Sequence, residues 1–305
     1  MIGSKYIVAS IVVLATPALA AYAPPEPVKS GETIVVTGQK PDLKELRRAT
    51  SEFVRTATVV PDDGQYARRN APLCPVVSGI DAQYANIAAR KIKAVATATG
   101  AKVAEAGCKP NLLVHFTTDS ATYIAEARKK RPGVFNESRV NDVASQSPIQ
   151  WWYSTDSRGS DGVPIGRNGA NSAVVGSGDP TALPSNNGRT QRTYSQSLIE
   201  TQLVVDLETT FVVIDVNKVN GFPLDSVAAY AGMISLAQIR PKIDYGSYPS
   251  ILAMFSDGKG AEKAPRDLTE WDYTYLRALY TTQPNRLARM QRTQIYGEMV
   301  KQLAK

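Results

Sequence analysis

The first twenty residues constrain where this chain can fold, because they have the pattern of a secretory signal peptide. Lys5 supplies a positive charge, residues 6–16 form an apolar run, and residues 18–20 are the Ala-Leu-Ala motif of a cleavage site. The run is too short, and Pro17 too close, for a stable membrane span. We therefore expect residues 1–20 to be removed and the mature protein to fold in the periplasm or outside the cell.

The two cysteines, Cys74 and Cys108, fit that compartment. An even number of cysteines in a secreted chain favours a disulfide. A redox pair usually has the spacing C-x-x-C, which this sequence lacks. We expect a structural bridge that stabilises the fold by about 3–4 kcal/mol, as chain entropy predicts for a loop of this length.

Composition narrows the classes of partner. Hydrophobic residues make up 43% of the chain and charged residues 21%, which is typical of a globular protein with a core. The net charge of +7 is spread along the chain, so we expect no nucleic-acid partner. Because no second apolar stretch is long enough, we also expect no membrane span after cleavage. Neither a Walker A motif nor G-x-G-x-x-G occurs, and we expect no cofactor.

A Pro-rich leader, residues 21–40, precedes the expected domain and contains a short β-type segment at 32–38. Its Ile-Val-Val-Thr-Gly stretch resembles one near the mature N-terminus of TonB-dependent outer-membrane receptors. This resemblance implies an accessory factor of such a receptor as one hypothesis. The alternative is a strand of the first domain.

Residues 41–305 alternate between helical and strand patterns, which predicts one α/β or α+β domain with helices packed on a mixed sheet. Asp161-Gly162 indicates a turn into a return strand at 163–165, and residues 166–192 have the composition of a flexible loop. The expected helices span 41–55, 81–100, 120–131 and 224–239, with two more running from Thr269 through Tyr280 and from Ala288 through Leu303; the expected strands span 111–117, 149–155, 203–205 and 211–216.

Local signals support two of these helices. Asp81 is a good N-cap, and Tyr84, Ala88, Ile92 and Val95 form one apolar stripe behind it, which we expect to be buried. Thr269 and Asp272 have the spacing of a capping box, with Leu268 placed for a hydrophobic staple.

The part from 210 to 283 carries a series of family-like segments. A strand at 211–216 leads into the helix at 224–239; further on come Tyr248-Pro249-Ser250-Ile251-Leu252, Leu268-Thr269-Glu270-Trp271-Asp272 and Leu276-Arg277-Ala278-Leu279-Tyr280. In order and spacing this resembles the second half of a metzincin-like zinc peptidase domain. The resemblance implies a zincin-like topology, and it is closest to uncharacterised secreted proteins that keep this frame. The alternative is an unrelated α/β domain.

The residues that would bind zinc in such a domain are missing. In the best register Tyr230, Ala231 and Ile234 stand at the His, Glu and second His of H-E-x-x-H. A shift by one, to Ala229, Tyr230 and Met233, supplies no ligands either. A catalytic zinc needs about three protein ligands, and the whole chain has one histidine. We therefore expect no metal site and a helix that buries Val227, Ala231 and Ile234.

The remaining candidates for binding are aromatic. On a strand, Trp152 points away from Trp151 and Tyr153, so one side of this cluster belongs to the core and the other can face a ligand. The alternative is that helices cover both faces. His115 shares a strand face with Leu113 and Thr117, where a lone histidine is most often structural.

Catalytic motifs are weak. A Ser-His-Asp triad would need His115, and no G-x-S-x-G motif accompanies it. Ser256 and Lys259 have S-x-x-K spacing, but we expect them to lie in a turn, and the partner motifs are absent. The sequence thus favours a secreted, non-catalytic protein that binds a peptide or envelope protein through a relic peptidase-like cleft or the aromatic face. The alternative is a periplasmic hydrolase that uses carboxylates or Ser256.

Overall fold

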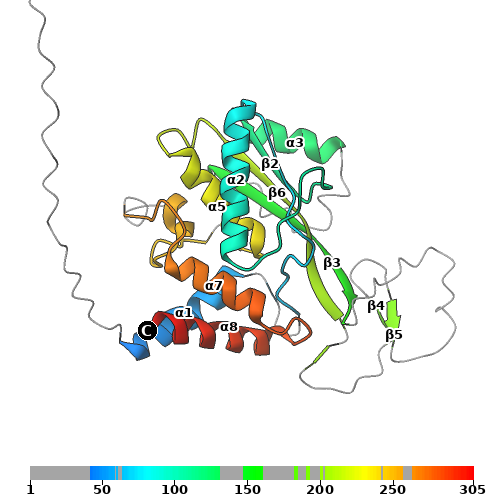
Figure 1. Cartoon of the computed structure of the whole chain (residues 1–305), viewed down its shortest axis with the longest axis vertical. Helices are drawn as coiled ribbons and strands as arrows, with labels where there is room; N and C mark the ends of the chain where they lie inside the picture. Colours follow the sequence, from blue (N-terminus) through cyan, green and yellow to red (C-terminus); the bar gives the residue numbers. More distant parts are fainter. Residues whose placement is uncertain are drawn as a thin grey trace, which may run out of the picture. The chain divides into compact units, whose positions relative to one another are not determined.

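The computed structural model describes residues 42–58, 60, 64–130, 147–160, 182–184, 190–192, 200–201, 203–241, 243–256 and 263–305. The expected signal peptide, the leader with its β-type segment and the return strand at 163–165 lie outside these residues. The described part is a mixed α/β fold, in which helices pack on a four-stranded sheet (Figure 1).

The sheet has the strand order β1-β2-β6-β3. Strands β1 (Pro75–Ser78), β2 (Leu112–Thr117) and β6 (Leu203–Asp215) run parallel, and β3 (Ile149–Gly159) pairs with β6 in the antiparallel direction. The sequence predicted two strands where β6 is one strand of 13 residues. Polar residues at 206 and 208–210 separate its apolar ends, and their pairing with β3 makes the strand continuous.

Two helices cover one face of the sheet. Helix α2 (Ala82–Ala98) follows β1, and α5 (Leu224–Leu236) follows β6 and packs against α2. At their contact a Cβ on Gly232 would lie 3.2 Å from Val95, so glycine allows a close approach. Ala88, Ile92 and Val95 are buried as predicted, but Tyr84 is 46% exposed, contrary to prediction, one turn before the covered part of the helix.

Helix α5 ends three residues earlier than predicted. Ala237 takes an extended conformation, and the following Ile239 forms a bridge with Thr58. Helix α3 (Ser120–Lys130) contacts β6, and its three cations in the last turn match the negative end of the helix dipole.

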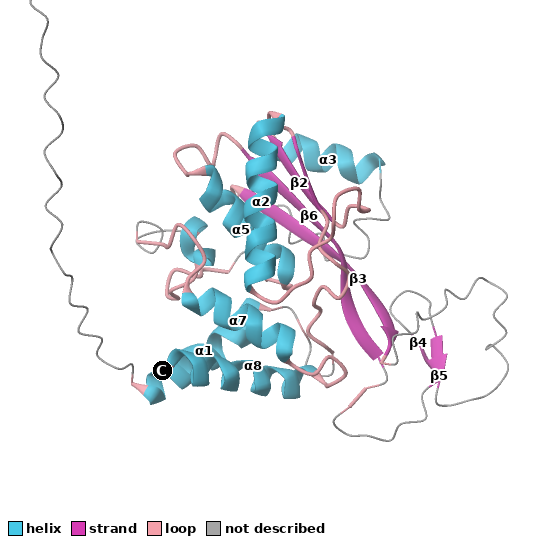
Figure 2. Ribbon diagram, viewed as in Figure 1, coloured by secondary structure: helices cyan, strands magenta, loops and turns pink. Residues whose placement is uncertain are grey.

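The helices α1 (Leu43–Ala57), α7 (Glu270–Thr281) and α8 (Ala288–Leu303) pack together below α2 and α5 in the view of Figure 2. Asp42 caps α1, so the helix starts two residues after Pro41. The predicted capping box of α7 is confirmed. The Asp272 carboxylate also accepts hydrogen bonds from Ser250 Oγ and the Ile251 amide, which holds the start of the short 3-10 helix η2 (Ile251–Phe255). Burial raises the pKa of Asp272.

Part of the expected loop at 166–192 forms a strand pair. Strand β4 (Ala182–Pro184) pairs with β5 (Thr190–Arg192) in the antiparallel direction. Three-residue strands are too short to show a period in the sequence, so composition alone indicated a loop. Within the described residues, no helix is both long and apolar enough to cross a membrane.

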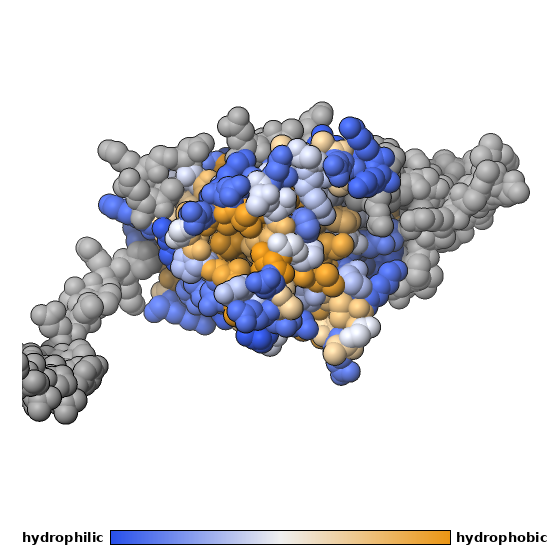
Figure 3. All heavy atoms as spheres, turned by 90° about the horizontal axis from the view of Figure 1, so that it is seen from above, coloured by the Kyte–Doolittle hydropathy of each residue, from blue (hydrophilic) through white to orange (hydrophobic). Residues whose placement is uncertain are grey.

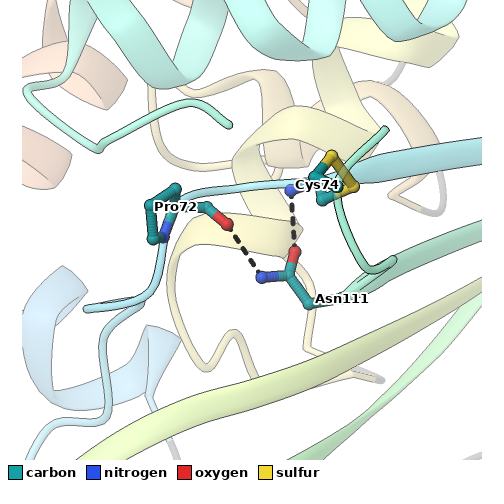
Figure 4. Close-up of a disulfide and its surroundings, with 4 residues drawn as sticks. Pro72, Cys74 and Asn111 are labelled. Atoms are coloured by element: carbon teal, nitrogen blue, oxygen red, sulfur yellow. Dashed lines mark hydrogen bonds between the residues drawn. A yellow bond between two sulfur atoms is a disulfide. The ribbon is translucent and has the colours of Figure 1, made fainter. Parts of the chain in front are cut away.

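Cys74 and Cys108 are bonded to each other, as predicted. The Asn111 side chain supports the bridge, because its oxygen accepts from the Cys74 amide (2.8 Å) and its nitrogen donates to the Pro72 carbonyl (2.9 Å; Figure 4). These bonds join the start of β1 to the start of β2.

Two consecutive arginines connect the sheet to the helices. The Arg69 guanidinium is 3% exposed and donates to the Asn111, Glu208 and Ser235 carbonyls and to Thr210 Oγ1. The Arg68 guanidinium donates to the carbonyls of Leu279, Tyr280 and Thr282. The ends of α5 and α7 are thus both bound by cations.

Removing the disulfide by the double change Cys74→Ser and Cys108→Ser should lower the free energy of unfolding by about 3–4 kcal/mol, because the unfolded chain gains loop entropy. Urea unfolding followed by circular dichroism measures this loss. Reductant should destabilise the wild type and leave the double variant unchanged; equal midpoints for the two proteins without reductant would contradict the prediction.

Arg69→Met should lower the free energy of unfolding by roughly 3 kcal/mol, because buried oxygens lose their donor. Arg90→Met, an exposed change on α2, is the matched control and should cost less than about 0.5 kcal/mol. Arg69→Lys should fall between them, since an ammonium cannot span four acceptors. Equal urea midpoints for Arg69→Met and Arg90→Met would refute this account.

Candidate binding site

The predicted aromatic cluster on β3 is divided between the two faces of the sheet. Trp151 and Tyr153 point into the core, where Trp151 Nε1 donates to the Ile239 carbonyl (3.0 Å). The Tyr153 hydroxyl donates to the Ile234 carbonyl (2.8 Å) and accepts from the Ile239 amide (3.0 Å). Burial raises the pKa of Tyr153. These contacts anchor the chain that leaves α5, so both side chains have a structural role.

The three positions that we expected to align with a zinc motif are part of the core. Tyr230 is 3% exposed, and Ala231 and Ile234 are fully buried, as the sequence predicted for the last two. The Tyr230 ring makes edge contacts with Trp151 and Phe255. Among the described residues, no group of three or more His, Cys, Asp or Glu side chains is placed to hold a metal ion. Side chains therefore fill the space around Tyr230.

Trp152 points to the opposite face, as predicted, and lies in a pocket with His115. Helix α3 covers only part of this outer face, and a pocket of about 380 Å³ remains beside it. Its volume is in the range of small-molecule and side-chain sites. The lining residues come from α3 and three strands: Leu113, His115, Tyr123, Glu126, Ala127, Lys130, Trp152, Phe211, Val212 and Val213.

Two stacked ring pairs shape the pocket. The register of β3 and β6 places Trp152 opposite Phe211, and their rings stack with centroids 5.1 Å apart. His115 of β2 stacks on Tyr123 of α3 with centroids 4.1 Å apart. The pocket thus offers aromatic surfaces, while Glu126 and Lys130, paired at 3.5 Å, supply its charge.

Apolar surface continues outside the pocket. Val76 (41% exposed) is the register partner of Leu113 (37% exposed), so together they form an apolar strip on the outer face. A group of apolar residues with hydrophilic ones around it also lies on the face that is seen from above (Figure 3). Exposed apolar areas of this kind often mark interaction sites.

His115 has a hydrogen-bond partner that the sequence analysis missed. Ser78 Oγ lies 2.9 Å from His115 Nδ1, because β1 and β2 pair these two residues in register. Burial lowers the pKa of His115. Among the described residues, His115 makes no hydrogen bond to a carboxylate, so a Ser-His-Asp triad is not assembled there.

Ser256, the serine of the S-x-x-K segment, takes part in a hydrogen bond to the backbone. Its Oγ accepts a hydrogen bond from the Tyr245 amide (3.0 Å) at the end of η2, while Lys259 lies outside the described residues.

Two pocket residues that the sequence analysis missed, Tyr123 and Phe211, could have been found in the sequence. Tyr123, Ala127 and Lys130 share one helical stripe, and Phe211 and Val213 alternate with core residues.

Comparisons with known proteins found no match to this chain: no family model matches it, and neither does any curated protein or solved structure.

The chain's single histidine allows a direct test of the pocket. The NMR titration of His115 should give a pKa below 6.5, and Tyr123→Ala should raise it, because removing the stacked ring admits water. Because the pKa is lowered in the folded chain, the unfolded chain binds the proton at a higher pH than the folded chain does. The free energy of unfolding should therefore fall as the pH drops below about 6.5. His115→Gln should flatten that dependence; a pKa at or above 6.5 in the wild type would contradict the burial of the ring.

Proposed function

We propose that this chain is a secreted or periplasmic protein that binds a peptide or protein partner, which inserts an apolar side chain into the pocket beside α3. One observation carries the proposal: a single pocket is lined by the rings of His115, Trp152, Tyr123 and Phe211. Buried aromatic anchors supply most of the energy in many interfaces.

The location of exposed apolar groups supports this site. Val76, Leu113 and Tyr123 are three of the five large apolar side chains that are exposed in the described part of the chain. They lie in or beside the pocket. A partner that covered them would remove apolar surface from water at about 25 cal/mol per Å².

Two features support the proposed compartment. The sequence begins with a signal-like run, and the Cys74–Cys108 bond is of the kind that persists in oxidising compartments. Both favour a protein that works outside the cytoplasm.

In this proposal the scaffold derives from a metzincin-like domain. The partner binds on the outer face of the sheet and not in the relic cleft that the sequence suggested. Strand β6 leads into α5, and α7 begins with its Thr269–Asp272 cap, in the order that the resemblance implies. Tyr230, Ala231 and Ile234 are packed in the core, which leaves no room there for a partner. Binding on the outer face, without zinc chemistry, agrees with both observations.

A photo-crosslinking amino acid in place of Leu113 should form one discrete adduct with the partner in the cell envelope, whereas the same residue in place of Tyr84 should not. Both positions are exposed and apolar, but only Leu113 lines the pocket.

The partner should depend on the pocket itself. Ala127→Trp fills the pocket from α3 and should reduce the adduct about tenfold, the effect of losing a typical anchor. Lys129→Trp, on the exposed side of the same helix, is the control and should leave it unchanged. An adduct that survives Ala127→Trp, or that forms equally from position 84, would refute binding in this pocket.

A further inference from the structure

Ser78 and His115 lie at one end of the apolar strip described above. Ser78 is the last residue of β1 and is exposed, and its Oγ is 2.9 Å from His115 Nδ1. The stack on Tyr123 fixes the imidazole ring in the orientation that reaches Ser78. A serine hydroxyl in contact with a held imidazole is the basic arrangement of nucleophilic catalysis.

We propose that Ser78 and His115 form a nucleophile–base pair that takes the acyl group from reactive esters of apolar acids. The proposal rests on the proposed function in one respect, since the acyl chain would use the same apolar surface as the partner. It adds an activity to a binding surface.

The chemistry requires the tautomer that carries its proton on Nε2. His115 Nδ1 then accepts the Ser78 proton while Oγ forms a bond to the ester carbonyl carbon. The bond from that carbon to the alcohol oxygen breaks, and the alcohol leaves with the proton from His115. A water molecule then attacks the acylated serine with His115 as base, which releases the acid and restores Ser78. Burial lowers the pKa of His115, which favours the neutral ring that can accept the proton.

The partners of His115 among the described residues limit the class of substrate. No carboxylate hydrogen-bonds to His115 among the described residues, and loss of the orienting aspartate costs about 10⁴ in rate in a serine protease. A pair of this kind is too weak for amides. Esters with a good leaving group need less assistance, so they are the class that the pair can turn over.

The neighbouring side chains define the acyl group. Val76 lies two residues before Ser78 on the same face of β1, and its register partner Leu113 leads to the pocket. Both side chains are exposed, so a short apolar chain bound to Ser78 Oγ can lie across them. A charged or strongly polar acid would gain nothing from this surface.

The test uses p-nitrophenyl butyrate with the mature, disulfide-bonded protein. Ser78→Ala should slow the release of p-nitrophenol at least about tenfold, and His115→Gln should have a similar effect, as expected for loss of a nucleophile or base. Ser154→Ala, on β3, is the matched control and should react like the wild type. Mass spectrometry of the quenched reaction should locate the butyryl group on Ser78, and the rate should rise with pH through the NMR-determined pKa of His115.

Two results would overturn the inference: hydrolysis by Ser78→Ala within about twofold of the wild-type rate, a difference too small for a lost nucleophile, or a butyryl group on another residue. Either result, obtained together with the crosslink from position 113, would refute the proposed activity but not the proposed binding function. Acylation of Ser78 without that crosslink would refute binding of a partner in the pocket but not the activity.

Discussion

The buried guanidinium of Arg69 connects the layers of this fold. It binds four oxygens, which belong to the residue before β2, to β6 and to the last turn of α5. No carboxylate is among these acceptors, and the partial negative charge at the end of α5 takes its place. Arg68 does the same for α7 through three carbonyls. Burial lowers the pKa of both arginines, yet a guanidinium stays charged in proteins. Two adjacent residues thereby fix two helix ends relative to the sheet.

This connection explains why the two faces of the sheet differ. With the end of α5 held by Arg69, the following segment lies where Trp151 and Tyr153 can bond to Ile239. The inner face is then closed by side chains, including those of Tyr230, Ala231 and Ile234. Among the described residues, the outer face is covered only by α3, a helix of 11 residues, and the small cluster of buried side chains there does not extend over β1. The pocket and the apolar strip therefore lie on the part of the outer face that α3 does not cover.

The sequence predicted features that depend on neighbouring residues. The capping box at Thr269, the buried stripe of α2 and the opposite orientation of Trp152 all follow from local spacing. Features that depend on pairing between distant segments were missed. Arg68 and Arg69 look like surface residues until their acceptors are placed, and Ser78 meets His115 only through strand register. The error at Tyr84 has the same cause, since the extent to which a helix is covered depends on its partners.

Strand register also relates the two proposals for the outer face. Val76 and Ser78 of β1 lie opposite Leu113 and His115 of β2, so each apolar residue of the strip is two positions from a polar one of the pair. A partner side chain needs the apolar members and the pocket, whereas acyl transfer needs the polar members and only a short apolar neighbour. The stacked Tyr123 belongs to both, because it lines the pocket and holds the imidazole. The proposed binding and the proposed chemistry are therefore separable at Ser78 and coupled at Tyr123.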